Sequence, residues 1–127
     1  MAAGVLGASG VLLGAFGEHL AKGDLQAHGA EAMWDKAMTF QLVHAAAMLG
    51  LACWMRTPLH GVAAHRMVLA VRWMLGGIVL FSGSLYLFAL GAPRGVMWLT
   101  PFGGAGLIIG WICVAGAAAA PRSEYDL

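Results

Sequence analysis

Charged side chains are scarce in this sequence. Lysine, arginine, aspartate and glutamate make up 10% of its 127 residues, whereas soluble globular domains carry about 25%. Hydrophobic residues make up 61%, and the mean hydropathy is +0.79. A soluble fold of this length could not keep so much apolar surface away from water. The composition therefore excludes a soluble domain and indicates one integral membrane domain, residues 1–127.

Features that point to a particular chemistry are also missing. The formal net charge is only +1 and no basic run occurs, so nucleic-acid binding is not expected. Only two cysteines are present, and Cys53 and Cys113 both lie in apolar segments, where we expect small packing residues rather than a disulfide. The sequence has no paired carboxylates, no nucleophile with a nearby base and no metal-spaced cluster. We therefore expect no enzymatic activity, no metal and no cofactor.

The chain does contain four long apolar segments. A helix needs about 20 residues to cross the hydrocarbon core, and the segment after Arg72 carries no charge before Arg94. No basic residue precedes the first segment, so we interpret it as a retained helix rather than a signal peptide. These segments predict an all-α transmembrane four-helix bundle with short loops. The predicted spans cover about residues 1–19, 37–55, 71–91 and 96–119.

The first and third connections carry turn signals. In residues 18–36, Gly23 and Asp24 are the expected break and N-cap before a helix that leads into the second span. In residues 91–95, a proline stops the helix and the glycines supply backbone freedom. We therefore expect the third and fourth spans to form an antiparallel hairpin.

Residues 56–72 are predicted to form the most basic loop. They contain Arg56, Arg66 and Arg72, and basic loops of membrane proteins tend to stay in the cytoplasm. An even number of spans then places both termini, with Arg122, on the same side. The predicted orientation therefore has cytoplasmic termini.

Glycines recur at steps of three and four in the first and last spans. This spacing places them on one face of a helix, and small residues let two helix backbones approach closely in lipid. We expect the two stripes to face one another or to face copies of the chain in an oligomer. The predicted packing residues are Gly7, Gly10, Gly14 and Gly17 in the first stripe, and Gly103, Gly106 and Gly110 in the second.

A few polar side chains fall inside the predicted spans. Gln41 and His44 are three residues apart and share one helix face. Polar groups in hydrocarbon are costly without partners, so these side chains should point into the bundle and pair there. The predicted buried polar cluster is Gln41, His44, Ser82, Ser84, Tyr86 and Thr100.

His44 is open to more than one interpretation. We favour a neutral histidine that is hydrogen-bonded to the third or fourth span; the alternatives are a haem ligand, a proton relay and a metal ligand. A bis-histidine haem would need a second histidine at similar depth. His19 lies at a helix end, whereas His28, His60 and His65 are predicted to lie in loops.

Short motifs along nearly the whole chain carry a family resemblance. They are Gly14-Ala15-Phe16-Gly17-x-His19, Trp34-x-x-Ala37, Phe40-Gln41-x-x-His44-Ala45, Phe81-Ser82-Gly83-Ser84-Leu85-Tyr86, Thr100-Pro101-x-Gly103-Gly104 and Gly110-Trp111. Together they resemble a family of small bacterial and eukaryotic membrane proteins known as domain of unknown function 423. The resemblance implies four transmembrane helices and a bacterial inner-membrane or organellar location, but no chemistry. Glu18 departs from the family pattern, which more often has alanine there.

The sequence leaves four classes of function open. We favour a packing or accessory subunit of a larger membrane complex, or a homo-oligomer, because of the glycine stripes, the short loops and the lack of a soluble domain. A conduit or carrier for a proton, ion or small solute is the second, although no charged residue lies clearly at mid-membrane, where relays usually keep one. A membrane enzyme or cofactor protein is the third, although the sequence lacks the residue patterns that catalysis or a metal would need. A lipid- or quinone-binding protein is the remaining alternative. The expected partners are the lipid bilayer and either other membrane proteins or further copies of this chain.

Overall fold

The described part of the computed structural model consists of helices joined by short connections. It covers residues 1–59 and 61–121, and no strand occurs within these ranges. The elements are α1 (Ala2–His19), α2 (Lys22–Ala27), α3 (Glu31–Trp54), α4 (Gly61–Ala89), the 3-10 helix η1 (Arg94–Trp98) and α5 (Leu99–Ala118). The all-α class is therefore confirmed.

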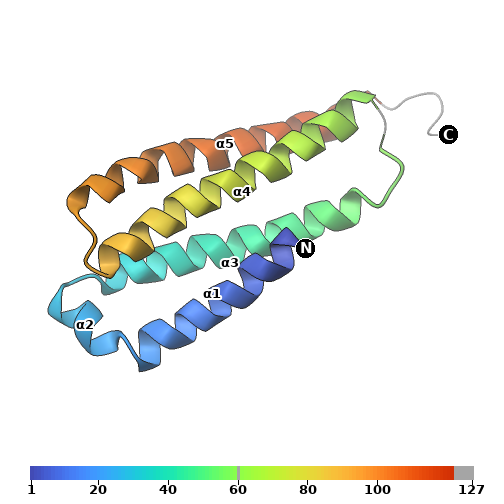
Figure 1. Cartoon of the computed structure of the whole chain (residues 1–127). Coiled ribbons are helices and arrows are strands. Elements are labelled where there is room, and N and C mark those ends of the chain that lie inside the picture. The colour runs from blue at the N-terminus through green and yellow to red at the C-terminus, as the bar shows by residue number, and fades with distance from the viewer. Residues whose placement is uncertain (60, 122–127) are drawn as a thin grey trace.

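The four long helices lie side by side in the order α1, α3, α4 and α5 (Figure 1). Each helix packs mainly on its neighbour in this row, and successive helices run in opposite directions. The start of α1 and the end of α5 lie at the end of the molecule where α3 leads into α4. The short helix α2 and the connection between α4 and α5 lie at the opposite end.

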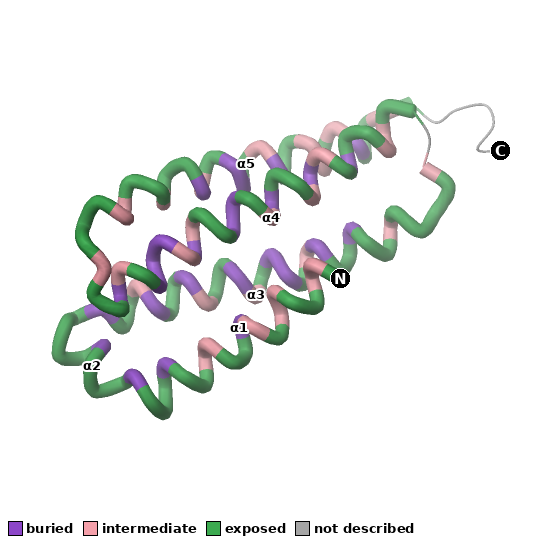
Figure 2. Tube along the Cα trace, in the orientation of Figure 1, coloured by how far each residue is buried: buried purple, intermediate pink, exposed green. Residues whose placement is uncertain are grey.

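Three of these helices are long and apolar enough to cross a membrane: Glu31–Trp54, Gly61–Ala89 and the combined segment Arg94–Ala118. Only 33%, 39% and 28% of their most apolar windows are buried within the chain. Figure 2 shows exposed positions along the whole length of every long helix. Large apolar side chains occupy many of them, so the molecule presents lipid with an apolar exterior.

The connection predicted at residues 56–72 is wrong. Helix α4 begins at Gly61, where φ is +56°, so His65, Arg66 and Arg72 belong to a helix. Residues 62–71 contain no glycine or proline, and they include alanine, arginine, methionine and leucine, which are good helix formers. Basic charge marks the cytoplasmic side but does not end a helix. His60 and Arg122, which entered the sequence argument, lie outside the described residues.

The break predicted at Gly23 and Asp24 is also wrong, because both residues lie inside α2. The break falls at Gly29, which has a φ of +61°. The Ala30 N–H donates to the Leu25 carbonyl at 2.8 Å, and the Gly29 N–H donates to the Gln26 carbonyl at 3.1 Å. This pair of bonds is a Schellman motif, which requires the left-handed conformation that glycine adopts readily.

The same motif forms the predicted hairpin between α4 and α5. Gly91 has a φ of +93°, and its N–H donates to the Phe88 carbonyl at 3.0 Å. The next N–H, of Ala92, donates to the Leu87 carbonyl at 2.9 Å. Pro93 then precedes η1. The hairpin prediction is therefore confirmed.

Candidate functional site

The first glycine stripe packs against α3. A Cβ atom added at Gly10 would lie 2.7 Å from Leu42 Cδ2, and one at Gly14 would lie 2.6 Å from the sulfur of Met38. Both positions therefore need glycine unless the opposite side chain moves. The facing pairs are Gly7 with Ala45, Gly10 with Leu42, Gly14 with Met38 and Gly17 with Trp34. The contact thus extends along nearly all of α1.

The second stripe packs against the backbone of α4. A Cβ atom added at Gly106 would lie 3.3 Å from Gly77 Cα, and one at Gly103 would lie 2.8 Å from the Gly77 carbonyl oxygen. At Gly110 the added atom would lie 3.3 Å from the Ala70 carbonyl oxygen. The two stripes therefore do not face each other, which is one of the two arrangements that the sequence predicts. The short hairpin places α5 beside α4, so the second stripe packs against α4.

Gln41 joins α3 to α1. Its Nε2 donates to the Leu6 carbonyl oxygen at 2.9 Å and to Ser9 Oγ at 2.8 Å. Ser9 Oγ also bonds to the Val5 carbonyl oxygen at 2.8 Å, one turn earlier in α1. Sequence reasoning missed Ser9, although it stands beside Gly10 of the packing stripe.

His44 joins α3 to α5. Trp111 Nε1 donates to His44 Nε2 at 3.2 Å, and His44 Nδ1 lies 2.8 Å from the Phe40 carbonyl oxygen. An indole N–H can only donate, so Nε2 is unprotonated and Nδ1 carries the proton that it donates to Phe40. The predicted hydrogen bond between His44 and the third or fourth span is confirmed, because Trp111 belongs to α5. Sequence reasoning missed Trp111 as the partner and noted it only within a family motif.

The hydroxyls of α4 bond to two different helices. Ser82 Oγ donates to the Ala37 carbonyl oxygen in α3 at 2.8 Å. Ser84 Oγ donates to the Phe81 carbonyl oxygen at 2.9 Å and lies 2.7 Å from Thr100 Oγ1 in α5. A serine has a single hydroxyl proton, so Thr100 is the donor to Ser84.

Tyr86 is the exception among the six residues of the predicted polar cluster. Its ring packs edge-on against Trp34, with the ring centroids 4.7 Å apart, and the residue is 8% exposed. The hydroxyl oxygen is buried and has no hydrogen-bond partner within the described residues. The six polar side chains thus do not form one network, and only Ser84 and Thr100 bond to each other.

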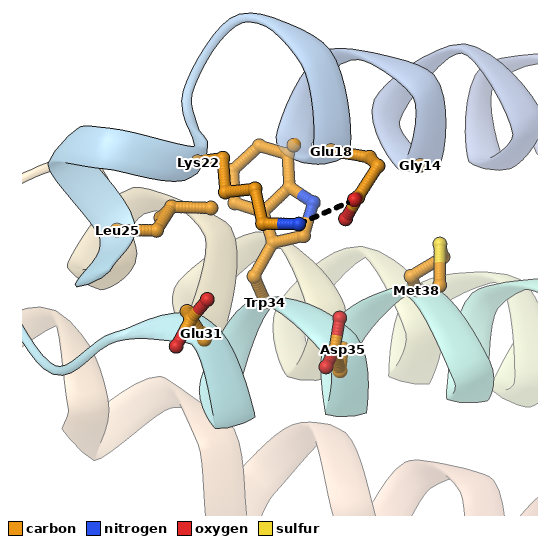
Figure 3. A pocket seen from close by; sticks show the side chains of 9 residues that line it. Gly14, Glu18, Lys22, Leu25, Glu31, Trp34, Asp35 and Met38 are labelled. Atoms are coloured by element: carbon orange, nitrogen blue, oxygen red, sulfur yellow. Dashed lines mark hydrogen bonds and ion pairs between the residues drawn. The ribbon is translucent and has the colours of Figure 1, made fainter.

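An open cavity of about 280 Å³ lies between α1, α2 and α3, near the end of the row (Figure 3). Figure 3 shows the Glu18–Lys22 ion pair on one side of it and Glu31 and Asp35 on the other. The ion-pair distance is 2.6 Å, and the hydrogen bond and charge of Glu18 raise the pKa of Lys22. The residues that line the cavity are Gly14, Gly17, Glu18, Lys22, Leu25, Glu31, Trp34, Asp35 and Met38.

This cavity has limited chemical capability. It carries three carboxylates and one ammonium, so its net charge is negative. In the described ranges, no group of three or more histidine, cysteine, aspartate or glutamate side chains is placed to hold a metal ion. The Trp34 ring lines the cavity, and its Nε1 donates to the Leu13 carbonyl oxygen at 3.2 Å.

Comparison with known proteins places this arrangement in a family. The family model described as Protein of unknown function (DUF423) matches residues 13–104. The UPF0382 membrane protein SAB0533 of Staphylococcus aureus is 34% identical over 116 residues, which cover 85% of this chain and 87% of the relative. The UPF0382 membrane protein YwdK of Bacillus subtilis is 34% identical, with 90% of this chain and 93% of the relative covered.

A third relative is the UPF0382 inner membrane protein YgdD of Escherichia coli, which is 36% identical over 80% of this chain and 73% of its own length. No solved structure matches the chain significantly. The family match covers more than half of the chain and agrees with the motifs in the sequence and with three helices apolar enough to span a membrane. This chain is therefore a membrane protein of the DUF423 family.

Proposed function

We propose that this protein is a non-enzymatic, four-span packing or accessory subunit of the bacterial inner membrane, assembled with copies of itself or with a larger membrane protein. One observation carries this proposal: five of the six side chains of the predicted polar cluster are engaged in hydrogen bonds within the chain. Interhelical hydrogen bonds of this kind hold helices together in lipid. They leave few polar groups free to act on a substrate.

The contact between α1 and α3 supports a fourth span. Helix α1 has 18 residues, which is about 27 Å at 1.5 Å per residue and close to the thickness of the hydrocarbon core. It lies antiparallel along α3, which is itself apolar enough to span. The bond from Gln41 to Ser9 shields a polar group of each helix from lipid. A location on the membrane surface would break these contacts.

The charge distribution supports cytoplasmic termini. Arg56 follows α3, while Arg66 and Arg72 lie in the first part of α4. The start of α1 and the end of α5 lie at this end of the row, and basic residues favour the cytoplasmic side. The name of the Escherichia coli relative, an inner membrane protein, supports the same location.

The polar groups do not favour a conduit. Gln41 points to α1, His44 to α5, and Ser82 to the backbone of α3. These groups lie in different interfaces, whereas a path for protons or solutes needs polar groups in succession along one route. The large apolar side chains exposed on the outside of the four helices instead support contact with other transmembrane helices.

Purification in mild detergent followed by measurement of the particle mass tests this proposal. The single chain has a mass of 13.2 kDa. We expect a particle of fixed composition, either a multiple of this mass or the chain with a stoichiometric membrane protein. Cys53 is exposed on α3, so oxidative crosslinking in native membranes provides a second measure of self-association, with Cys53→Ser as the control.

Three results would contradict the packing role. A monomer that conducts protons or solutes in vesicles would favour the conduit. A bound pigment would favour a cofactor protein. Catalytic turnover by the purified monomer would refute a non-enzymatic role.

A further inference from the structure

Arg72 lies on the exposed side of α4, within the helix Gly61–Ala89 that is long and apolar enough to cross a membrane. The carbonyl oxygen of Ala70 lies 3.3 Å from the position of a Cβ atom at Gly110, so this turn of α4 faces Gly110. Helix α5 ends at Ala118, eight residues later, which is about 12 Å at 1.5 Å per residue. A guanidinium at this depth needs a polar partner or access to the membrane surface.

The described chain offers Arg72 no nearby carboxylate. Residues 36–121 contain neither aspartate nor glutamate. The acidic residues that the structure describes lie toward the α2 end of the molecule (Figure 1), and they are Glu18, Asp24, Glu31 and Asp35. Arg66 adds further positive charge near Arg72, because its Nη1 donates at 2.6 Å to the neutral carbonyl of Gly116. This end of the molecule therefore carries uncompensated positive charge within the described residues.

The surroundings of Arg72 match the shape and polarity of a lipid. The adjacent Trp73 is 45% exposed, and tryptophan is enriched at the level of lipid headgroups. One turn deeper, Gly76 has no atom within 4 Å of the position of a Cβ atom, which leaves room for an acyl chain. His65 is exposed on the same face of α4, two turns nearer the start of the helix.

We propose that Arg72 binds the phosphate of an anionic phospholipid of the cytoplasmic leaflet, with an acyl chain lying over Gly76. The guanidinium extends toward the membrane surface and donates charge-assisted hydrogen bonds to the phosphodiester. An anionic lipid such as phosphatidylglycerol fits better than phosphatidylcholine, whose own ammonium group compensates its phosphate. The proposal requires that α4 spans the membrane with its first part on the cytoplasmic side, and it does not depend on the packing role.

Trp73 provides the readout for this site. The protein is reconstituted in vesicles that contain either phosphatidylglycerol or phosphatidylcholine with brominated acyl chains, at equal mole fractions. Bromine quenches tryptophan fluorescence, so the measured quantity is the fluorescence quenching. The contribution of Trp73 is the difference in quenching between the protein and its Trp73→Phe variant. We expect phosphatidylglycerol to occupy the position next to Trp73 about fivefold more than phosphatidylcholine, the factor that one basic residue near the surface provides.

Arg72→Gln is expected to remove this preference, whereas Arg72→Lys keeps the charge and is expected to keep at least part of it. The matched control is Arg94→Gln, at the opposite end of the α4–α5 pair, which is expected to leave the preference unchanged. Circular dichroism of each variant establishes that it is folded. If Arg72→Gln does not fold, the test is the preference of the wild-type protein itself: it must favour phosphatidylglycerol, and Arg94→Gln must keep that preference.

Four outcomes would overturn the proposal. One is equal quenching by the two lipids in the wild-type protein, and another is an equal loss of preference in Arg94→Gln. A third is loss of the preference for phosphatidylglycerol when inorganic phosphate is added at matched ionic strength, because the site would then bind free phosphate rather than a lipid. A changed particle mass in folded Arg72→Gln would assign Arg72 to a contact between copies.

Discussion

The indole nitrogen of Trp111 donates a hydrogen bond of 3.2 Å to Nε2 of His44. This bond links α5 to α3, two helices that both pack on α4 between them. It also determines the tautomer of His44, because the indole nitrogen has no lone pair to accept a proton in return. The bond is therefore a structural use of a histidine that the sequence alone leaves open to several functions.

A double-mutant cycle measures this link. His44→Leu and Trp111→Phe each remove one partner, and the energy of interaction between them should be about 0.6 kcal/mol and below about 1.7 kcal/mol, the range found for interhelical bonds in membranes. Thermal unfolding in detergent provides the values. If Trp111→Phe costs the same in the wild-type and His44→Leu backgrounds, the two side chains do not interact.

Gly103 and Gly76 form a matched pair for the packing of α5 on α4. An added Cβ at Gly103 would overlap the Phe81 backbone nitrogen, whereas at Gly76 it would contact nothing. Gly103→Ala should therefore lower stability by about 1–3 kcal/mol, as overpacking does. Gly76→Ala should be neutral or stabilise by up to about 1 kcal/mol, because alanine favours the helix. Equal unfolding temperatures for the two variants would contradict the backbone contact.

The structure and the sequence predict different effects of Tyr86→Phe on stability. The sequence predicts a small loss of stability, because the hydroxyl is expected to be paired. In the structure the hydroxyl has no partner within the described residues, and an unpaired buried polar group costs about 1–3 kcal/mol. The variant should therefore be at least as stable as the wild type. Ser82→Ala, which loses the bond to Ala37, is the control and should be less stable.

Local chemistry could be predicted from the sequence more readily than the pairing of helices. Gly91 and Pro93 identify the hairpin because only a few residues interact there. The depth of His44 predicts that it needs a partner, but nothing local identifies Trp111, which is 67 residues away. Likewise, the glycine stripes identify packing faces but not the helix that each one meets.

The errors at the helix ends have a common physical cause. Gly23 and Gly29 look equally able to interrupt a helix, and the tertiary contacts around α2 determine which one does. Leu25 is 4% exposed, so burying it stabilises a helical turn through Gly23. The sequence predicts too late a start for α4 because Arg66 suggests a loop, whereas its guanidinium bonds to the end of α5.

Cysteine-accessibility labelling tests the four-span topology most directly, on which the orientation and the packing role rest. In a Cys53→Ser, Cys113→Ser background, single cysteines are introduced by Ala2→Cys, Ser123→Cys and Arg94→Cys, and a membrane-impermeant reagent is applied from each side. We predict that the first two react from the cytoplasmic side and the third from the opposite side. Labelling of Ala2→Cys and Ser123→Cys from opposite sides would show that α1 does not complete an even set of spans, and would contradict the account.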